Sequence, residues 1–152
     1  MPIGKRVIFV GPADGANHKP LHEEGVCTEV ALPGAVLDYA AASAGFELMD
    51  DAATVFGKPL LVADKDEARS KSVDDAWTLN ENMVAIRPRS GEFLNVLVVT
   101  GQALIKGTAL TRSAVTPGAL VIAATGGTEE ILCYADEIVS TTATQLVRVR
   151  VV

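Results

Sequence analysis

The stretch Gln145-Leu146-Val147-Arg148-Val149-Arg150-Val151-Val152 decides the fold class of this chain. Its valines alternate with two arginines, which gives a hydrophobic period of two residues. This period is expected when one face of a β-strand is buried and the other is in water. The stretch therefore predicts a strand that packs on a hydrophobic core through its valines.

Short apolar runs separated by glycine and proline continue this pattern through the rest of the chain, and such runs are typical of many short strands with tight turns. We predict further strands over residues 7–10, 27–32, 60–63, 83–87, 94–100, 103–105 and 119–124. Turns are expected at residues 87–91, 106–107, 116–118 and 126–127. Residues 35–44 fit either a helix or a strand, and the charged residues 65–75 predict a solvated loop.

The predicted fold is mainly β: a compact single-domain β-barrel or β-sandwich with an extended N-terminal arm. A chain of 152 residues, 49% hydrophobic and 21% charged, has the size and balance of one folded domain. Aromatic residues make up only 5% of the chain, so the core must consist mainly of Val, Leu, Ile and Ala. Many of these are β-branched, which favours sheet over helix.

Charge and cysteine usage exclude several classes of partner and compartment. The formal net charge is −6 and the pI is about 4.8, so the average surface repels nucleic acids and anionic membranes. No stretch resembles a signal peptide or a membrane span. With only Cys27 and Cys133, we expect two reduced, packed thiols in a protein made in a cytoplasm.

The first thirty residues differ from the rest, and we expect residues 1–30 to be an arm and residues 31–152 the β domain. Residues 11–25 are rich in Gly, Pro, His and Asn and show no apolar periodicity. Such an arm tends to become ordered on a neighbouring subunit, although a terminus without a role is the alternative. The candidate contact residues of the arm, for capsid or subunit, are Val7, Ile8, Phe9, Val10, His18 and His22.

No constellation in the sequence predicts catalysis, a cofactor or a metal site. His18 and His22 have zinc-ligand spacing, but Pro20 lies between them and interrupts a helix. Cys27 has only His22 nearby as a base. The carboxylate clusters at residues 50–51, 64–67 and 74–75 lack the pattern of a calcium loop, and no glycine-rich segment has the form of a phosphate loop. We therefore expect a protein that is not an enzyme.

Two fragments are similar to motifs of small trimeric dUTP hydrolases, which are all-β chains of similar length. Arg89-Ser90-Gly91 resembles their phosphate-contacting segment, and residues 34–39 (GAVLDY) resemble the segment that holds sugar and base. Their order here is the reverse of the order in that family. The C-terminal glycine-rich tail of the family is replaced by Arg148-Val149-Arg150-Val151-Val152. A dUTPase-like enzyme remains the alternative, as does another β binding module.

A longer resemblance covers residues 32 to 137. Its landmarks, in order, are Leu32-Pro33-Gly34, residues 58–64 (KPLLVAD), 72–77 (SVDDAW), 83–87 (MVAIR), 91–97 (GEFLNVL), 101–110 (GQALIKGTAL), 117–120 (PGAL) and 134–137 (YADE). These resemble the head decoration, or cement, proteins of tailed bacteriophages. Residues 101–110 are the most specific piece. Glu81-Asn82 departs from the family, which usually has Gly-Asp there, and residues 1–30 have no counterpart.

The resemblance implies a structural virion protein, made in the cytoplasm of a bacterial host and bound to the capsid exterior. Its implied partners are the phage major capsid protein and further copies of itself, as a homotrimer or alternatively a dimer. It would bind across the seams between capsid subunits and so stabilise the assembled shell by mass action. The resemblance implies no catalytic residue, cofactor or metal.

Overall fold

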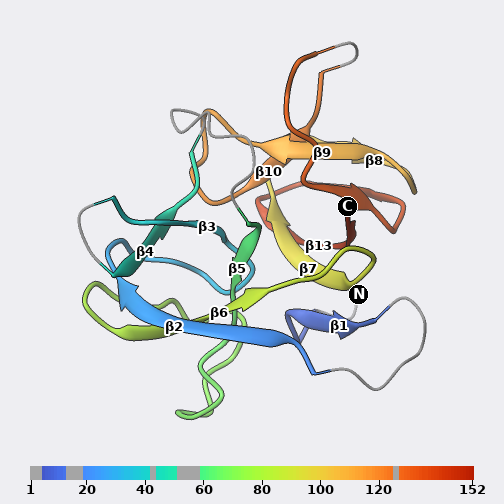
Figure 1. Ribbon diagram of the computed structural model, residues 1–152. Helices are drawn as coiled ribbons and strands as arrows, with labels where there is room; N and C mark the ends of the chain where they lie inside the picture. Colours follow the sequence, from blue (N-terminus) through green and yellow to red (C-terminus); the bar gives the residue numbers. More distant parts are fainter. Residues whose placement is uncertain (1–4, 13–18, 42–43, 51–58, 125–126) are drawn as a thin grey trace.

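The computed structural model describes residues 5–12, 19–41, 44–50, 59–124 and 127–152. These residues form thirteen β-strands and no helix, so the predicted mainly-β class is confirmed. None of them lies in a helix that is long and apolar enough to cross a membrane. Figure 1 shows the strands gathered into two small barrels that lie side by side.

The first barrel is a closed ring of five strands in the order β2-β4-β3-β5-β6. Its strands are β2 (Leu21–Cys27), β3 (Val36–Tyr39), β4 (Gly45–Leu48), β5 (Leu61–Ala63) and β6 (Asn82–Arg87). The longest pairing is antiparallel and joins β2 to β6, from Leu21 opposite Arg87 to Val26 opposite Asn82. Strand β2 also pairs in parallel with β4, which closes the ring on its other side. Residues 35–44, for which the sequence left helix and strand open, thus contribute a strand.

The second barrel is built on β7 (Phe93–Val98) and β13 (Gln145–Val151), which pair antiparallel along six residues. Its remaining strands are β1 (Phe9–Gly11), β9 (Ala109–Arg112), β10 (Leu120–Ile122) and β11 (Cys133–Ala135). The order is β1-β7-β10-β9-β11-β13, and the β13–β7 pairing closes the ring with β1 attached outside it. A separate two-stranded ribbon consists of β8 (Ala103–Leu104) and β12 (Val139–Ser140).

Strand β13 confirms the alternation from which its fold class was predicted. Val147, Val149 and Val151 are buried, whereas Arg148 and Arg150 lie on the outer face. The valines pack in a core cluster together with Leu94 and Val96 of β7.

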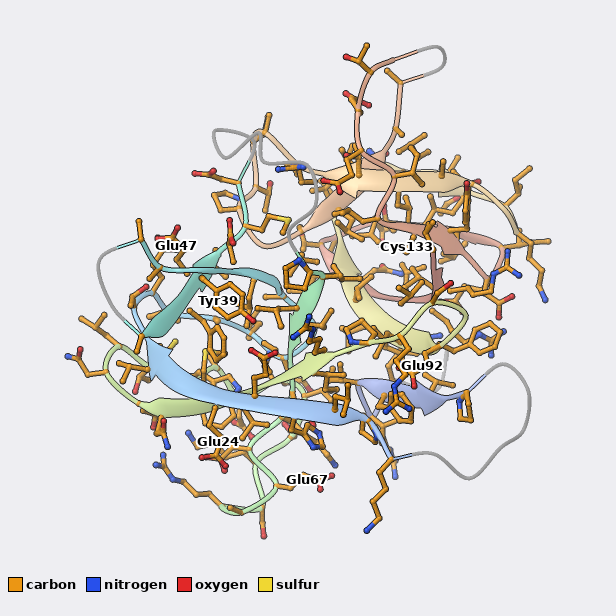
Figure 2. All side chains as sticks on the ribbon, viewed as in Figure 1. Glu24, Tyr39, Glu47, Glu67, Glu92 and Cys133 are labelled. Carbon is orange, nitrogen blue, oxygen red and sulfur yellow. The ribbon has the colours of Figure 1, made fainter. Side chains whose placement is uncertain are left out.

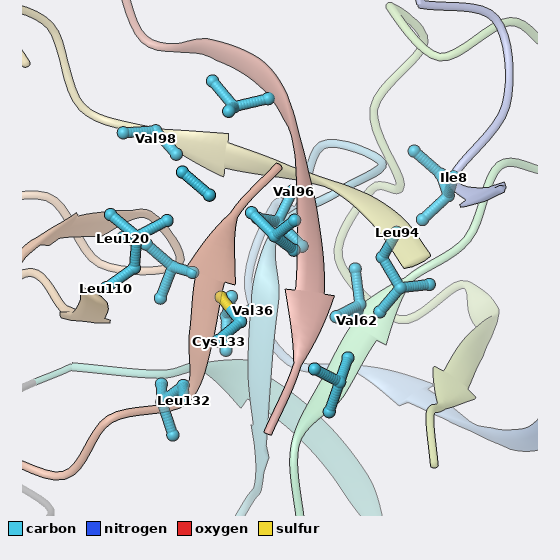
Figure 3. Packing of buried hydrophobic residues seen from close by; sticks show 14 of the residues in the cluster. Ile8, Val36, Val62, Leu94, Val96, Val98, Leu110, Leu120, Leu132 and Cys133 are labelled. Atoms are coloured by element: carbon cyan, nitrogen blue, oxygen red, sulfur yellow. The ribbon is translucent and has the colours of Figure 1, made fainter. Parts of the chain in front are cut away.

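The two barrels share this core and therefore form one domain. Val36, Val62 and Ile86 belong to strands of the first barrel, yet they pack in the same cluster as the valines of β13. Figure 3 shows Val36 and Val62 beside Leu94, Val96 and Cys133. Backbone hydrogen bonds also cross the seam, where the N–H of Leu97 donates to the carbonyl of Gly34 at 2.9 Å and that of Val36 donates to Gly118 at 2.8 Å.

Gly34 allows the barrels to approach this closely. Its φ is +86°, in the left-handed region that favours glycine, and a Cβ at this position would overlap the side chain of Leu146. The backbone of the first barrel therefore lies directly against the first residues of β13.

The N-terminal region differs from the extended arm that the sequence predicts. Strand β1 pairs with β7 of its own chain, and residues 21–27 form a strand of the first barrel instead of part of an arm. Strand β2 contains one glycine, Gly25, and the ring of Phe46 fills the space above it. Gly25 is buried where a strand would usually carry an apolar side chain. The sequence of β2 therefore lacks the apolar alternation by which a strand is predicted. Residues 1–4 and 13–18 lie outside the described residues.

Candidate functional site

The structure describes five of the six predicted contact residues and does not gather these five into one surface. Ile8 is 1% exposed and belongs to the core, whereas Val7 and Val10 are more than two-fifths exposed beside β7. Phe9 is partly buried against the core cluster, His22 lies on β2 of the first barrel, and His18 lies outside the described residues. The segment from Val7 to Val10 is thus part of the domain and not a free strand, because Ile8 and Phe9 pack on the core.

His22 pairs with a carboxylate of its own barrel. Its Nε2 lies 3.3 Å from Oδ2 of Asp64, which follows β5. The indole N–H of Trp77 donates to the backbone carbonyl of Asp64 at 2.7 Å, so this corner joins three segments of the chain. Burial raises the pKa of the Asp64 carboxyl. The arrangement links β2 to the loop after β5.

Both thiols are buried and free. Cys27 donates to the backbone carbonyl of Glu29, and desolvation raises its pKa. Burial alone raises the pKa of Cys133 far above the usual range of a thiol. Both shifts favour the protonated thiol at neutral pH, whereas a cysteine nucleophile must be a thiolate.

The carboxylate clusters of the first barrel hold turns in place. Asp75 accepts the backbone N–H of Ser72 at 2.7 Å, which lowers the pKa of its carboxyl. Glu81 accepts the backbone N–H of Thr78 and the guanidinium of Arg69, both at 2.6 Å, and these contacts lower its pKa to about 2. Within the described ranges, no group of three or more His, Cys, Asp or Glu side chains is placed to hold a metal ion.

The two fragments that resemble dUTP hydrolase motifs lie in different barrels. Arg89 belongs to the turn before β7, where its backbone N–H donates to Glu92. Asp38 and Tyr39 belong to β3 of the first barrel, and they point to opposite faces because Asp38 is buried and Tyr39 is exposed.

An open pocket of about 600 Å³ lies where the two barrels meet. Its wall is largely aliphatic, and its polar rim includes Lys5, Asp74 and Glu137. The amine of Lys5 lies 2.8 Å from both oxygens of the Glu137 carboxylate, so these two rim charges neutralise each other. The other lining residues are Leu32, Pro33, Val73, Leu97, Val139, Thr144, Gln145 and Leu146.

The β8–β12 ribbon carries an exposed aliphatic pair that the sequence did not single out. Val139 pairs with Leu104 and Ser140 with Ala103, so the same register extended by one residue places Ile138 opposite Ile105. Ile105 is 64% exposed and Ile138 is 77% exposed. The two isoleucines are 33 positions apart in the sequence, and only the ribbon pairing brings them together. We call Ile105 and Ile138 the isoleucine pair.

Charge is distributed unequally between the barrels. Residues 19–87, which contain all strands of the first barrel, have thirteen acidic and six basic side chains, whereas residues 88–152 have five of each. The acidic character of the chain therefore resides in the first barrel. Figure 2 shows Glu24 and Glu47 on the left of the view and Glu67 at its lower end, whereas Glu92 and Cys133 of the second barrel lie on the right.

Comparison with known proteins gives no relative on which to base an assignment. No protein-family model matches this chain, and no curated protein matches it.

Proposed function

We propose that this chain is a structural virion protein that binds the outside of an assembled phage capsid and stabilises the shell. The support from sequence is the ordered resemblance of residues 32 to 137 to head decoration proteins. The proposal assigns it no catalytic residue and no cofactor. Its partners would be the major capsid protein and further copies of itself, in a trimer or a dimer.

The observation that carries the proposal is the position of the isoleucine pair. The most specific segment of the resemblance, residues 101–110, forms β8, the turn that begins at Ile105, and the start of β9. Two large aliphatic side chains that are mostly in water raise the free energy of the isolated chain, and covering them with a partner lowers it. The β8–β12 ribbon is therefore the surface we assign to the capsid protein.

Mass action explains how such binding would stabilise a shell. A ligand that binds the assembled subunits and not the separated ones shifts the equilibrium toward assembly. Closed symmetry among the decorating copies would prevent open filaments and would fit threefold or twofold positions on the capsid. The acidic first barrel would lie away from the packaged DNA, for which no affinity is needed.

The test uses capsids of the phage that encodes the chain, assembled without it. Purified chain should co-sediment with these capsids in saturable, stoichiometric amounts and raise their melting temperature. The double variant Ile105→Ser with Ile138→Ser should bind at least about tenfold more weakly, which is 1.4 kcal/mol. Val115→Ser is the matched control, because Val115 is 89% exposed at the opposite end of β9.

Two results would count against the proposal. Absence of saturable binding by the wild-type chain would overturn the function. Equal loss of binding in the Val115 control and in the double variant would leave the function standing but remove the assignment to the ribbon.

A further inference from the structure

Three side chains form a row across the outer face of the second barrel. Arg150 of β13 is opposite Tyr134 of β11 on one side and opposite Phe93 of β7 on the other. All three point outward, since their neighbours along each strand are buried in the core. We call Tyr134, Arg150 and Phe93 the arginine row.

Arg150 differs from the other arginines on the strands, because it is exposed and forms no ion pair with a described carboxylate. Arg87, Arg112 and Arg148 pair with Glu23, Glu130 and Asp136, at distances of 2.8 to 3.3 Å. Arg89, in the turn beside the end of β13, is likewise exposed and has no such partner within the described part of the chain. The carboxylate closest in sequence to that turn, Glu92, is buried and accepts the backbone N–H of Arg89.

The composition of the row is that of a protein-binding surface. Tyrosine, phenylalanine and arginine are enriched in interfaces, and a guanidinium between aromatic side chains gains cation–π attraction when water is removed. A surface of this kind selects a partner with carboxylates. The required partner chemistry is therefore acidic.

The chain itself contains such an acidic surface on its other barrel. Glu24 on β2 is exposed, Glu47 on β4 is half-buried, and neither forms an ion pair with a described basic side chain. Figure 2 shows both to the left of Glu92 of the second barrel, with Glu47 the more distant of the two. Within one copy, neither carboxylate pairs with Arg150, whereas a second copy placed head to tail can bring the opposite charges together.

We infer that the arginine row of one copy binds the acidic first barrel of a second copy, in a head-to-tail contact. A contact between two different surfaces of the same chain closes into a ring when its rotation permits. Complementary charges at both surfaces favour the correct partner and speed its encounter. The inference rests on the homo-oligomer of the proposed function, but it does not depend on capsid binding.

The test is the mass of the purified full chain in solution, measured by light scattering and sedimentation over a range of concentrations. The wild-type chain should form a discrete oligomer at low salt and dissociate in part at high salt, because exposed charges are screened. Arg150→Glu should weaken association at least about tenfold.

A charge exchange distinguishes a direct contact from damage to the fold. Adding Glu24→Arg and Glu47→Arg to Arg150→Glu should restore association, whereas those two changes alone should weaken it. Should Arg150→Glu unfold the barrel, Arg150→Gln and Arg89→Glu provide milder changes at the same surface. Thermal melting of every variant reports whether it is folded.

The outcomes separate this inference from the wider proposal. A wild-type oligomer that persists in folded Arg150→Glu and Arg89→Glu variants would overturn the arginine row and leave the oligomer standing. A wild-type chain that is monomeric at every concentration and salt would overturn both the row and the oligomer. Neither result bears on co-sedimentation with capsids.

Discussion

The amine of Lys5 lies 2.8 Å from each carboxylate oxygen of Glu137, although the two residues are 132 positions apart. The same carboxylate accepts the backbone N–H of Arg148 at 2.7 Å. Glu137 thus connects the segment before β1 to β13, and it does so at the rim of the pocket between the barrels.

Lys5→Met should lower the free energy of unfolding by less than about 1 kcal/mol, because the ion pair is partly in solvent. Glu137→Ala should cost more, about 1–3 kcal/mol, since it also leaves the Arg148 N–H without its acceptor. Urea denaturation of both single variants and the double variant measures the coupling. Strictly additive effects would show that the pair contributes nothing.

Gly34→Ala should destabilise the fold strongly, by about 2–4 kcal/mol, because it adds a steric overlap with Leu146 to the cost of a positive φ. Gly107→Ala is the matched control, since its φ is +88° and no atom lies within 4 Å of the added Cβ in the described structure. Chemical denaturation measures the loss of unfolding free energy in each variant. The difference between the two variants gives the part of the loss that is due to the close approach of the barrels. Equal losses would contradict that account.

Replacing Cys27 and Cys133 together with Ala should cost about 1–3 kcal/mol per site and leave capsid binding and self-association intact. Both thiols are buried with raised pKa values, so the wild-type chain should react with a thiol reagent only after denaturation. Rapid labelling of the folded chain, or loss of binding in a folded double variant, would contradict this expectation.

Stability should fall in acid, partly through Glu81. Its pKa is lowered in the folded chain to about 2, so its contribution is present above its ordinary value near 4.5 and is lost as the pH drops toward 2. Glu81→Gln should reduce the loss of stability between about pH 4.5 and pH 2. Glu24→Gln, at an exposed residue, is the control and should not change this loss. Melting temperature against pH for both variants measures the effect, and identical curves for Glu81→Gln and wild type would exclude it.

The sequence predicted the mainly-β fold because alternation is a local signal. The valines of β13 show this alternation along the whole strand, and their burial confirms the prediction. Strand β2 gave no such signal, since an inward glycine under Phe46 replaces an apolar side chain. The pairing partners of the strands could not be predicted from the sequence either. The parallel pairing of β2 with β4 depends on which strand edges meet in the folded chain.

The candidate surfaces were visible in the sequence only in part. Arg148 and Arg150 were both predicted on the outer face of their strand, but the aromatic neighbours of Arg150 come from β7 and β11. Ile105 and Ile138 belong to different apolar runs, and only the β8–β12 register places them together. The segment from Val7 to Val10 was expected to contact a neighbouring subunit, but the side chains of Ile8 and Phe9 pack on the core of their own chain.

Strand β13 is synthesised after every other strand of the chain, yet it pairs with both β7 and β11 and closes the second barrel. On the ribosome, that barrel must stay open until β13 leaves the exit tunnel. Val36, Val62 and Ile86 of the first barrel are buried in the same core as the valines of β13. The core of the first barrel is therefore also incomplete until β13 has been synthesised. Folding is therefore expected after translation of the whole domain and not barrel by barrel during synthesis.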